Sequence, residues 1–287
     1  MAEQGVVPIR GFLLHLTHYD PTWYARKSRE KPFDLDLGLE IVDAMAETGL
    51  NLLVIDCADG VQYSSHPELA RRYSVPMDYL ERLVKRAQAQ GIEVVPKLNF
   101  SQSGTHHHND WFRPYNDLFD NDEYWRIAFE LIDELVQTCH PRRFFHVGMD
   151  EDHDRAYSQY IAAILRLHSG LEERGLRTII WNDSSHGGPA LVHAEKSLAA
   201  EKKIPHDVVQ VVWDYERVQP DIVRRLVQKG FEVWAAPGQA AELVSQWRQA
   251  ILRYGGQGLL MTAWIPCQRS NRARLLRLIR TIGPMYA

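Results

Sequence analysis

Short runs of apolar, β-branched or aromatic residues recur eight times along the chain, and segments with helical spacing separate them. This alternation is typical of consecutive βα units. The predicted strands cover residues 10–16, 50–57, 93–100, 143–150, 177–183, 208–215, 231–236 and 258–265. A (β/α)8 TIM barrel typically needs ~250 residues. We therefore expect the 287 residues to form an α/β protein, with a single barrel domain over residues 1–287.

Glycines mark the ends of several predicted helices. Apolar residues repeat at helical spacing from Leu35 to Ala46, and Gly49 follows as a C-terminal stop. Further helices are expected to end at Gly91 and Gly175, and another begins at Asp122. An open, doubly wound sheet is the alternative fold. No G-x-G-x-x-G or P-loop motif opens the first helix, so nucleotide-binding versions of that fold lose support.

The charge balance bears on the class of partner. Lys and Arg total 33 against 37 Asp and Glu, a net charge of -4 that attracts neither nucleic acid nor an anionic membrane. No stretch approaches the ~20 apolar residues of a membrane helix. The N-terminus lacks the basic region of a signal peptide, so a cytoplasmic location is expected. Cys57, Cys139 and Cys267 are far apart, which argues against disulfides and thiolate zinc sites. The oligomeric state stays open.

An acidic pair, Asp150-Glu151, directly follows the predicted fourth strand. In a TIM barrel, functional residues lie where strands end and βα loops begin. Adjacent side chains of an extended strand point to opposite faces, so both carboxyls reach one pocket only where the pleat breaks. Gly148 permits a close backbone approach at this point. Taken alone, the pair also fits an acidic first turn of a helix.

Tryptophans lie near the ends of the four predicted strands that follow, as Trp181, Trp213, Trp234 and Trp264. Indole faces stack on the C–H patches of a pyranose, while carboxylates and amides bind its hydroxyls. The alternative is that these rings fill the barrel or the layer between its strands and helices. Together with the acidic pair, they favour a protein that acts on carbohydrate.

The segment from His146 to Glu151 resembles a signature of glycoside hydrolase family 20, the β-N-acetylhexosaminidases. His146-Val-Gly-Met-Asp150-Glu151 matches the family's H-x-G-x-D-E motif at the end of strand four. Arg10-Gly11 is similar to the family's R-G on strand one, and Asp59 falls on the first aspartate of the N-x-L-H-x-H-x-x-D-D segment. Trp181, Trp213 and Trp264 fall where the family supplies its aromatic pocket walls.

The resemblance implies removal of a terminal β-linked N-acetylhexosamine (GlcNAc or GalNAc) by a substrate-assisted, retaining mechanism. The substrate's 2-acetamido oxygen attacks the anomeric carbon. Asp150 is expected to orient that group and stabilise the oxazolinium charge, while Glu151 acts as general acid and then as general base. Strand seven ends Ala-Ala-Pro-Gly-Gln239 without a carboxylate, in agreement with a mechanism that needs no separate nucleophile. The expected partner is an N-acetylhexosaminide, with no cofactor and no metal.

Other substrate contacts follow from the same resemblance. The expected binding residues are Arg10, Asp59, His106, His146, Trp181, Trp213, Tyr215, Gln239 and Trp264. His106, His107 and His108 are equivalent candidates for the histidine that supports the acid. Tyr215 is a candidate replacement for the family's strand-seven tyrosine, whose place Gln239 takes. The chain departs from the family at strand three, where Lys97 and Asn99 replace carboxylates, and after Trp264, where Ile265-Pro266 replaces G-E.

Three alternatives remain open. One is a two-carboxylate glycosidase of other specificity, with Glu151 as acid and Asp214 or Glu216 as its partner. A metal-dependent isomerase or hydrolase would use His15, His18, Asp56 and the run from 106 to 108, although three adjacent histidines diverge and more often form a solvated loop. The last is a carbohydrate-binding barrel that has lost catalysis.

Overall fold

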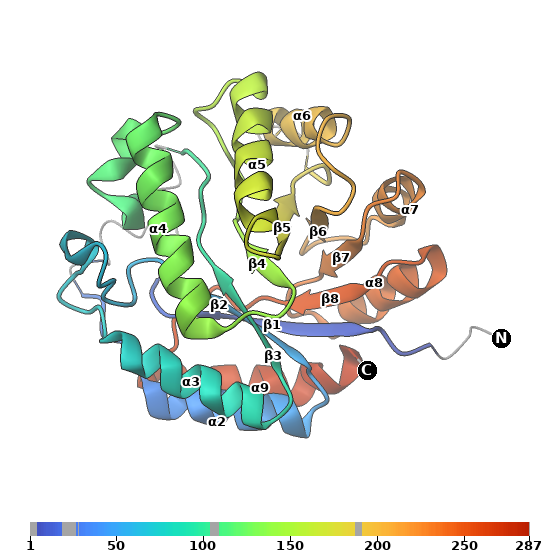
Figure 1. Cartoon of the computed structure of the whole chain (residues 1–287). Helices are drawn as coiled ribbons and strands as arrows, with labels where there is room; N and C mark the ends of the chain where they lie inside the picture. Colours follow the sequence, from blue (N-terminus) through green and yellow to red (C-terminus); the bar gives the residue numbers. More distant parts are fainter. Residues whose placement is uncertain (1–4, 19–26, 28, 104–108, 187–190, 287) are drawn as a thin grey trace.

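The structure is a computed structural model that describes residues 5–18, 27, 29–103, 109–186 and 191–286 (Figure 1). Eight parallel strands follow one another around a closed barrel in the order β1 to β8. They are β1 (Ile9–His15), β2 (Leu52–Asp56), β3 (Glu93–Lys97), β4 (Phe144–His146), β5 (Arg177–Asn182), β6 (Val209–Trp213), β7 (Val233–Ala236) and β8 (Gly258–Met261). Pairing of Phe12 with Met261 closes the ring between β1 and β8. The predicted TIM barrel is confirmed.

Each strand is followed by a helix, and the helices surround the barrel (Figure 1). They are α2 (Leu35–Glu47), α3 (Met77–Ala89), α4 (Asp122–Cys139), α5 (Tyr157–Glu172), α6 (Leu191–Ala200), α7 (Pro220–Gln228), α8 (Ala241–Tyr254) and α9 (Arg272–Ile282). Gly49, Gly91 and Gly175 follow α2, α3 and α5 with φ of 78°, 73° and 70°. This left-handed conformation suits glycine, and it confirms the predicted helix stops. Within the described residues, none of the helices combines the length and apolarity of a membrane span.

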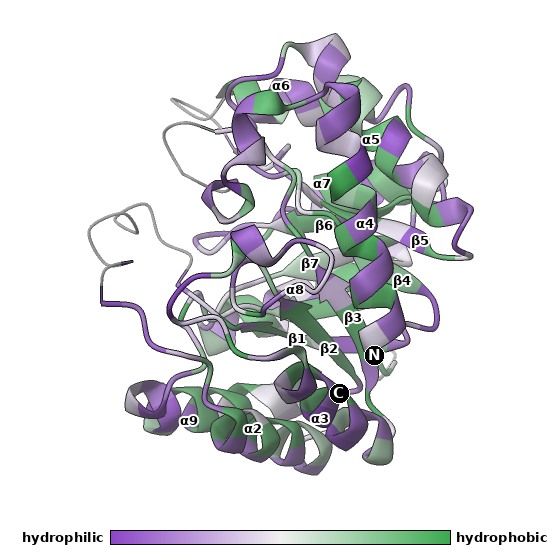
Figure 2. Cartoon of the chain, turned by 60° about the vertical axis from the view of Figure 1, so that its left-hand side comes forward, coloured by the Kyte–Doolittle hydropathy of each residue, from purple (hydrophilic) through white to green (hydrophobic). Residues whose placement is uncertain are grey.

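The apolar core has two layers because successive side chains of a strand alternate between its faces. Leu13, Val54 and Leu260 belong to the cluster inside the barrel. Phe12 and Leu53 belong to the larger cluster, which packs the strands against the helices. Figure 2 shows hydrophobic residues along the strands and mixed hydrophobic and hydrophilic residues along the helices. This arrangement leaves polar chemistry to the strand ends and loops.

Seven of the eight strands end earlier than the sequence predicts, and the endings of β4 and β8 shape the candidate site. β4 stops at His146 instead of residue 150, because Gly148, Met149 and Glu151 have φ of 71°, 73° and 49°. β8 stops at Met261 instead of residue 265, and Trp264 has φ of 53°. Residues with positive φ leave the extended conformation, so the chain turns here. The pleat breaks at the end of strand four, as expected for a pair of carboxyls that share one pocket.

Candidate functional site

The acidic pair lies just beyond β4, with its two members in different environments. Asp150 is buried, at 4% exposure, and one of its carboxylate oxygens accepts a 2.6 Å hydrogen bond from Nδ2 of Asn99. Glu151 is partly exposed, and its backbone N–H donates to Oδ2 of Asp183 at 2.8 Å. One carboxyl is therefore fixed inside the protein, while the other has access to solvent and to a ligand.

Asn99, which binds the Asp150 carboxylate, packs closely against Gly148 and binds the backbone of the same turn. Its Oδ1 accepts hydrogen bonds from the backbone N–H of Met149 at 3.2 Å and of Ser101 at 2.9 Å. A Cβ atom added to Gly148 would lie 2.2 Å from that Oδ1. The predicted role of Gly148 in close packing is confirmed. Asn99 is a site residue that the sequence indicated only as a departure from the family pattern.

Asp183, at the end of β5, is a second residue that sequence reasoning did not assign to the site. It is 2% exposed, and its Oδ1 accepts a 2.8 Å hydrogen bond from the indole Nε1 of Trp213. Burial raises the pKa of Asp183 to about 8, and the charge of Asp150 adds to this rise, while the N–H donors of Glu151 and Trp213 oppose it. The sequence feature that could have identified Asp183 is its position at the end of strand five, two residues after Trp181.

Aromatic side chains from β6 and the segment after β8 form a wall next to the acids. Trp213, Tyr215 and Trp264 are partly exposed. Trp264 donates from Nε1 to the hydroxyl of Tyr215 at 2.9 Å, and the rings of Trp213 and Tyr215 are 5.5 Å apart. Trp181 is buried at 1% exposure, 6.1 Å from the Trp264 ring. The structure therefore brings together three predicted aromatic residues and Tyr215.

His146 lies inside the barrel beneath this wall. Its ring is fully buried and 4.8 Å from the ring of Trp181. Burial, followed by the positive charge of Lys97, lowers the pKa of His146 to about 3, although Asp150 opposes this. Nδ1 accepts a hydrogen bond from the N–H of Gly148 at 3.0 Å, so the neutral ring carries its proton on Nε2. Neither that Nε2 nor the Nε1 of Trp181 has a partner among the described residues.

A buried ion pair occupies the next strands of the barrel. Nζ of Lys97 lies 2.7 Å from Oδ2 of Asp56, and Nδ1 of His15 lies 3.2 Å from the same oxygen. Burial acts to raise the pKa of Asp56, but Lys97 and His15 outweigh it and hold this pKa well below its usual range. Lys97, which replaces a carboxylate of the family pattern on strand three, thus forms a buried ion pair inside the barrel.

The described residues of the metal-dependent alternative do not form a metal site. His15 and Asp56 belong to the ion pair with Lys97, whereas His18 pairs with Glu30 at 3.2 Å. In the part of the chain that the structure describes, no group of three or more His, Cys, Asp or Glu is arranged to hold a metal ion. The predictions for His106, His107 and His108 lie outside the described residues.

The prediction that Arg10 binds substrate is wrong. Arg10 pairs with Leu259 near the beginning of β1, at the end of the barrel opposite the acidic pair. Its neighbours Ile9 and Gly11 occupy the alternate, inward positions, so Arg10 faces out. Its guanidinium donates to the carbonyls of Val7 at 2.8 Å and Gly49 at 2.7 Å. Strand alternation and position along β1 both remove it from the site.

Three further predictions meet a mixed outcome. Gln239 is exposed on the loop after β7 and donates to the carbonyl of Ala263, close to the aromatic wall. Trp234 instead fills the barrel, fully buried and edge-on to Phe144, so the alternative of core packing holds for it. The carboxylate of Asp214 accepts hydrogen bonds from the backbone N–H groups of Glu216 and Arg217 in its own loop. This carboxylate was the candidate partner of Glu151 in a two-carboxylate glycosidase, and it is already engaged by its own loop.

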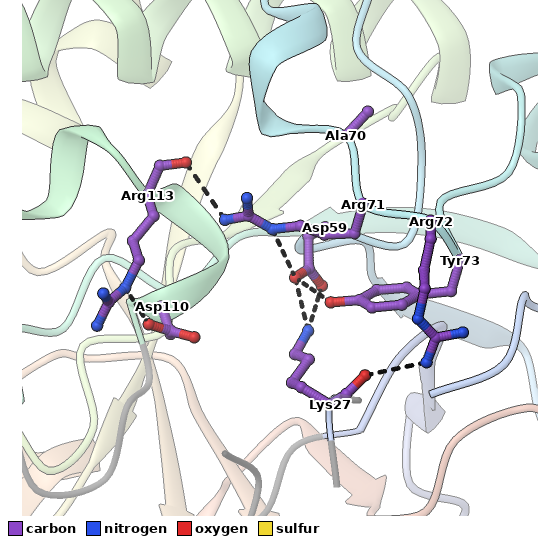
Figure 3. A pocket seen from close by; sticks show the side chains of 8 residues that line it. All are labelled: Lys27, Asp59, Ala70, Arg71, Arg72, Tyr73, Asp110 and Arg113. Carbon is purple, nitrogen blue, oxygen red and sulfur yellow. Dashed lines mark hydrogen bonds and ion pairs between the residues drawn. The ribbon is translucent and has the colours of Figure 1, made fainter. Parts of the chain in front are cut away.

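Asp59 lies in a separate pocket rather than beside Asp150. It follows β2, is 1% exposed, and both of its oxygens bind Nζ of Lys27, at 2.7 and 2.6 Å (Figure 3). The hydroxyl of Tyr73 donates to it at 2.7 Å, and that of Thr17 at 3.2 Å. Its carboxylate is therefore saturated by protein donors, and it is not placed to accept a sugar hydroxyl at the acidic pair.

Solved structures with a similar barrel include glycoside hydrolases of family 20. The fold resembles that of a Vibrio harveyi exo-β-N-acetylglucosaminidase in complex with N-acetylglucosamine (TM-score 0.68, 12% identity, 97% of this chain and 54% of that chain). It also resembles a Streptomyces coelicolor β-N-acetylhexosaminidase (0.68, 15%, 96% and 63%) and Dispersin B (0.62, 14%, 96% and 98%). No protein-family model and no curated protein matches the sequence. The chain thus has a barrel fold similar to that of these enzymes, and it spans about half the length of the Vibrio enzyme.

Proposed function

We propose that the protein is a glycoside hydrolase that removes a terminal β-linked N-acetylhexosamine by substrate-assisted catalysis. The observation that carries this proposal is the unequal pair at the end of β4. Asp150 is buried and fixed by Asn99, while Glu151 is partly exposed and its backbone binds Asp183, which also accepts from Trp213. A fixed carboxylate suits a group that orients the substrate, and an accessible one suits proton transfer to a leaving group.

In the proposed reaction, the acetamido oxygen of the sugar attacks the anomeric carbon as the bond to the leaving oxygen breaks. Glu151 donates its proton to that oxygen, and the charge of Asp150 stabilises the oxazolinium ion. A water molecule then attacks the anomeric carbon, gives its proton to Glu151 and restores the acetamido group. The configuration is retained because two inversions occur. Trp213, Tyr215 and Trp264 would stack against the sugar, as their partial exposure allows.

The test is hydrolysis of an aryl β-N-acetylglucosaminide and an aryl β-N-acetylgalactosaminide by the wild type, Asp150→Asn and Glu151→Gln. We expect each substitution to lower kcat by about 10²–10⁴-fold, the usual contribution of a positioned acid or charge. Glu151→Gln should be partly spared when the leaving group needs no protonation. Glu216→Gln, an exposed carboxylate on the loop after β6, is the matched control and should retain activity.

A plain aryl glucoside separates this mechanism from a two-carboxylate one. It lacks the 2-acetamido group, so we expect no cleavage at a comparable rate. Comparable cleavage of the glucoside, or unchanged rates in either variant, would contradict the assigned roles. Binding of N-acetylglucosamine without any turnover by the wild type would instead support the carbohydrate-binding barrel.

A further inference from the structure

One buried carboxyl joins the turn that carries Glu151 to the aromatic wall. Asp183 directly follows β5 and is 2% exposed. Its Oδ2 accepts the backbone N–H of Glu151, and its Oδ1 accepts the indole Nε1–H of Trp213, both at 2.8 Å. β5 lies between β4 and β6 in the barrel (Figure 1), so a single side chain at its end spans the ends of both neighbouring strands.

The backbone of Asp183 is itself anchored. Its N–H donates to Oγ of Ser197 on α6 at 3.0 Å, and its carbonyl oxygen accepts the backbone N–H of His186 at 3.0 Å. A side chain that is locked by packing and by further hydrogen bonds holds its partners in one geometry. The Asp183 carboxyl can therefore serve as a fixed reference for the two groups that bind it.

Trp213 is held at three points by the segment after β5. Asp183 binds its indole N–H, and the hydroxyl of Ser185 donates to its backbone carbonyl at 2.6 Å. The ring of His186 lies 3.9 Å from the Trp213 ring. Trp213 is still partly exposed, so some of its surface stays open to a ligand. The orientation of this wall residue therefore depends on the segment that Asp183 begins.

Glu151 depends on the same carboxyl for its direction. Its φ is 49°, a conformation that residues other than glycine rarely adopt. The bond from its N–H to Asp183 stabilises this turn, and the turn sets the direction in which the Glu151 side chain leaves the backbone. A displacement of about 1 Å at a reacting group can lower a rate by about 10²-fold, so this bond bears directly on proton transfer.

We propose that Asp183 is a positioning residue that fixes the general acid Glu151 relative to Trp213. This rests on the proposed function, because it assigns a further role within the same site. Asp183 acts through its two hydrogen bonds. The bond to Glu151 sets the place of the acid at the leaving oxygen, and the bond to Trp213 sets the indole against which the sugar ring stacks.

The leaving group separates positioning of the acid from general damage to the protein. Phenyl and dinitrophenyl β-N-acetylglucosaminides are the substrates, because the phenolate needs a proton as it departs and the dinitrophenolate does not. We expect Asp183→Ala to lower kcat about 10²-fold for the phenyl glycoside and less than about tenfold for the dinitrophenyl glycoside. KM should rise by the same factor for both, since Trp213 contacts the sugar that they share.

Asp183→Asn is the second variant, and it answers the question if the alanine variant does not fold. It keeps the size of the side chain, but its amide nitrogen faces one of the two N–H donors, so it should show the same dependence on the leaving group. Asp207→Ala is the matched control. That carboxylate lies just before β6, is 51% exposed and pairs with His168, so its variant should keep the wild-type kcat and KM. An equal loss of kcat for both glycosides in the Asp183 variants overturns the proposal.

NMR tests the link between Glu151 and Trp213 without any need for catalysis. In protein with isotope-labelled tryptophan and glutamate, Trp213→Phe and Glu151→Gln identify the two N–H signals by their loss. We expect Trp213→Phe to move the backbone signal of Glu151, because the two groups share one carboxyl. Asp183→Asn should speed hydrogen exchange at the Trp213 indole by about tenfold or more. A Glu151 signal that Trp213→Phe leaves unmoved overturns the proposal.

The two proposals fail separately. If the wild type hydrolyses neither glycoside but the Glu151 signal responds to Trp213→Phe, the proposed function is contradicted and the role of Asp183 in fixing Glu151 relative to Trp213 is supported. If the wild type hydrolyses both glycosides and Asp183→Asn changes neither kcat nor the exchange of the indole, the reverse holds.

Discussion

Single residues with unusual backbone angles determine where the acids lie. Met149 and Glu151 hold φ of 73° and 49° although neither is glycine, so neighbouring contacts must stabilise these conformations. The contacts are the hydrogen bonds from Met149 to Asn99 and from Glu151 to Asp183. Each of the two acidic residues of the proposed site thus depends on a polar partner that follows a neighbouring strand, β3 for Asn99 and β5 for Asp183.

Gly148→Ala should destabilise the protein far more than Gly49→Ala, a replacement at a glycine with a similar φ. The new Cβ would lie 2.2 Å from Oδ1 of Asn99 and 2.8 Å from its Cα, in addition to the strain at φ of 71°. We expect a loss of about 3 kcal/mol or more in the free energy of unfolding, measured in urea. Gly49→Ala is the matched control, because φ is 78° there but nothing lies within 4 Å. It should cost about 1 kcal/mol. Equal losses would contradict the close packing at Gly148.

Asp183→Asn should change how stability depends on pH. The folded-state pKa of about 8 lies above the unfolded value of ~3.9, so this carboxyl's contribution is fully present below about pH 4 and is lost as pH rises through about 8. The amide cannot accept both N–H donors, so the variant should be less stable at about pH 5, by about 1–3 kcal/mol. The deficit should shrink by about pH 9, as measured by urea unfolding across this range.

The control for that measurement is Asp221→Asn on α7, where the carboxylate is 83% exposed. Its unfolding free energy should stay parallel to that of the wild type between about pH 5 and pH 9. A constant deficit for Asp183→Asn over the same range would mean that Asp183 is ionised throughout, against the pKa rise that its burial implies.

At the scale of elements, one buried arginine joins the loops after β3 and β4 to the start of α4. Arg155 is 1% exposed and donates to the carbonyl of Phe100 and to Asp152, both at 2.8 Å. It also pairs with Asp120 at 2.8 Å. Asp152 follows Glu151 directly, so this network sets the path of the chain as it leaves the acidic pair.

Arg155→Met should therefore lower both stability and activity. Removal of one partner leaves Asp152 buried with less compensation, which typically costs about 3–5 kcal/mol. Arg166→Met on α5, the helix that begins just after Arg155, is the control, because that side chain is 47% exposed and lies 3.5 Å from an exposed Asp122. Its effect on urea unfolding should stay below about 1 kcal/mol. Similar effects of the two substitutions would show that the network contributes little.

At the scale of the whole molecule, closure of the barrel brings distant residues to one edge. Parallel strands all end on the same side, so Asn99, Asp150, Asp183 and Trp213 meet although they come from four βα units. The same closure separates residues that the family pattern groups together. Arg10 lies at the opposite end of β1, and Asp59 lies in the separate pocket that Lys27 and Tyr73 also line.

The sequence alone determined the eight βα units, the helix stops and the position of the acidic pair, because each depends on local pattern: apolar alternation, glycine at positive φ and the order of residues at a strand's end. Only the tertiary structure decided which polar partners hold that pair. Asn99 and Asp183 become partners through the register between neighbouring strands, and Arg10 is excluded by the face on which its side chain lies. These contacts join different βα units, so the sequence of a single strand does not predict them.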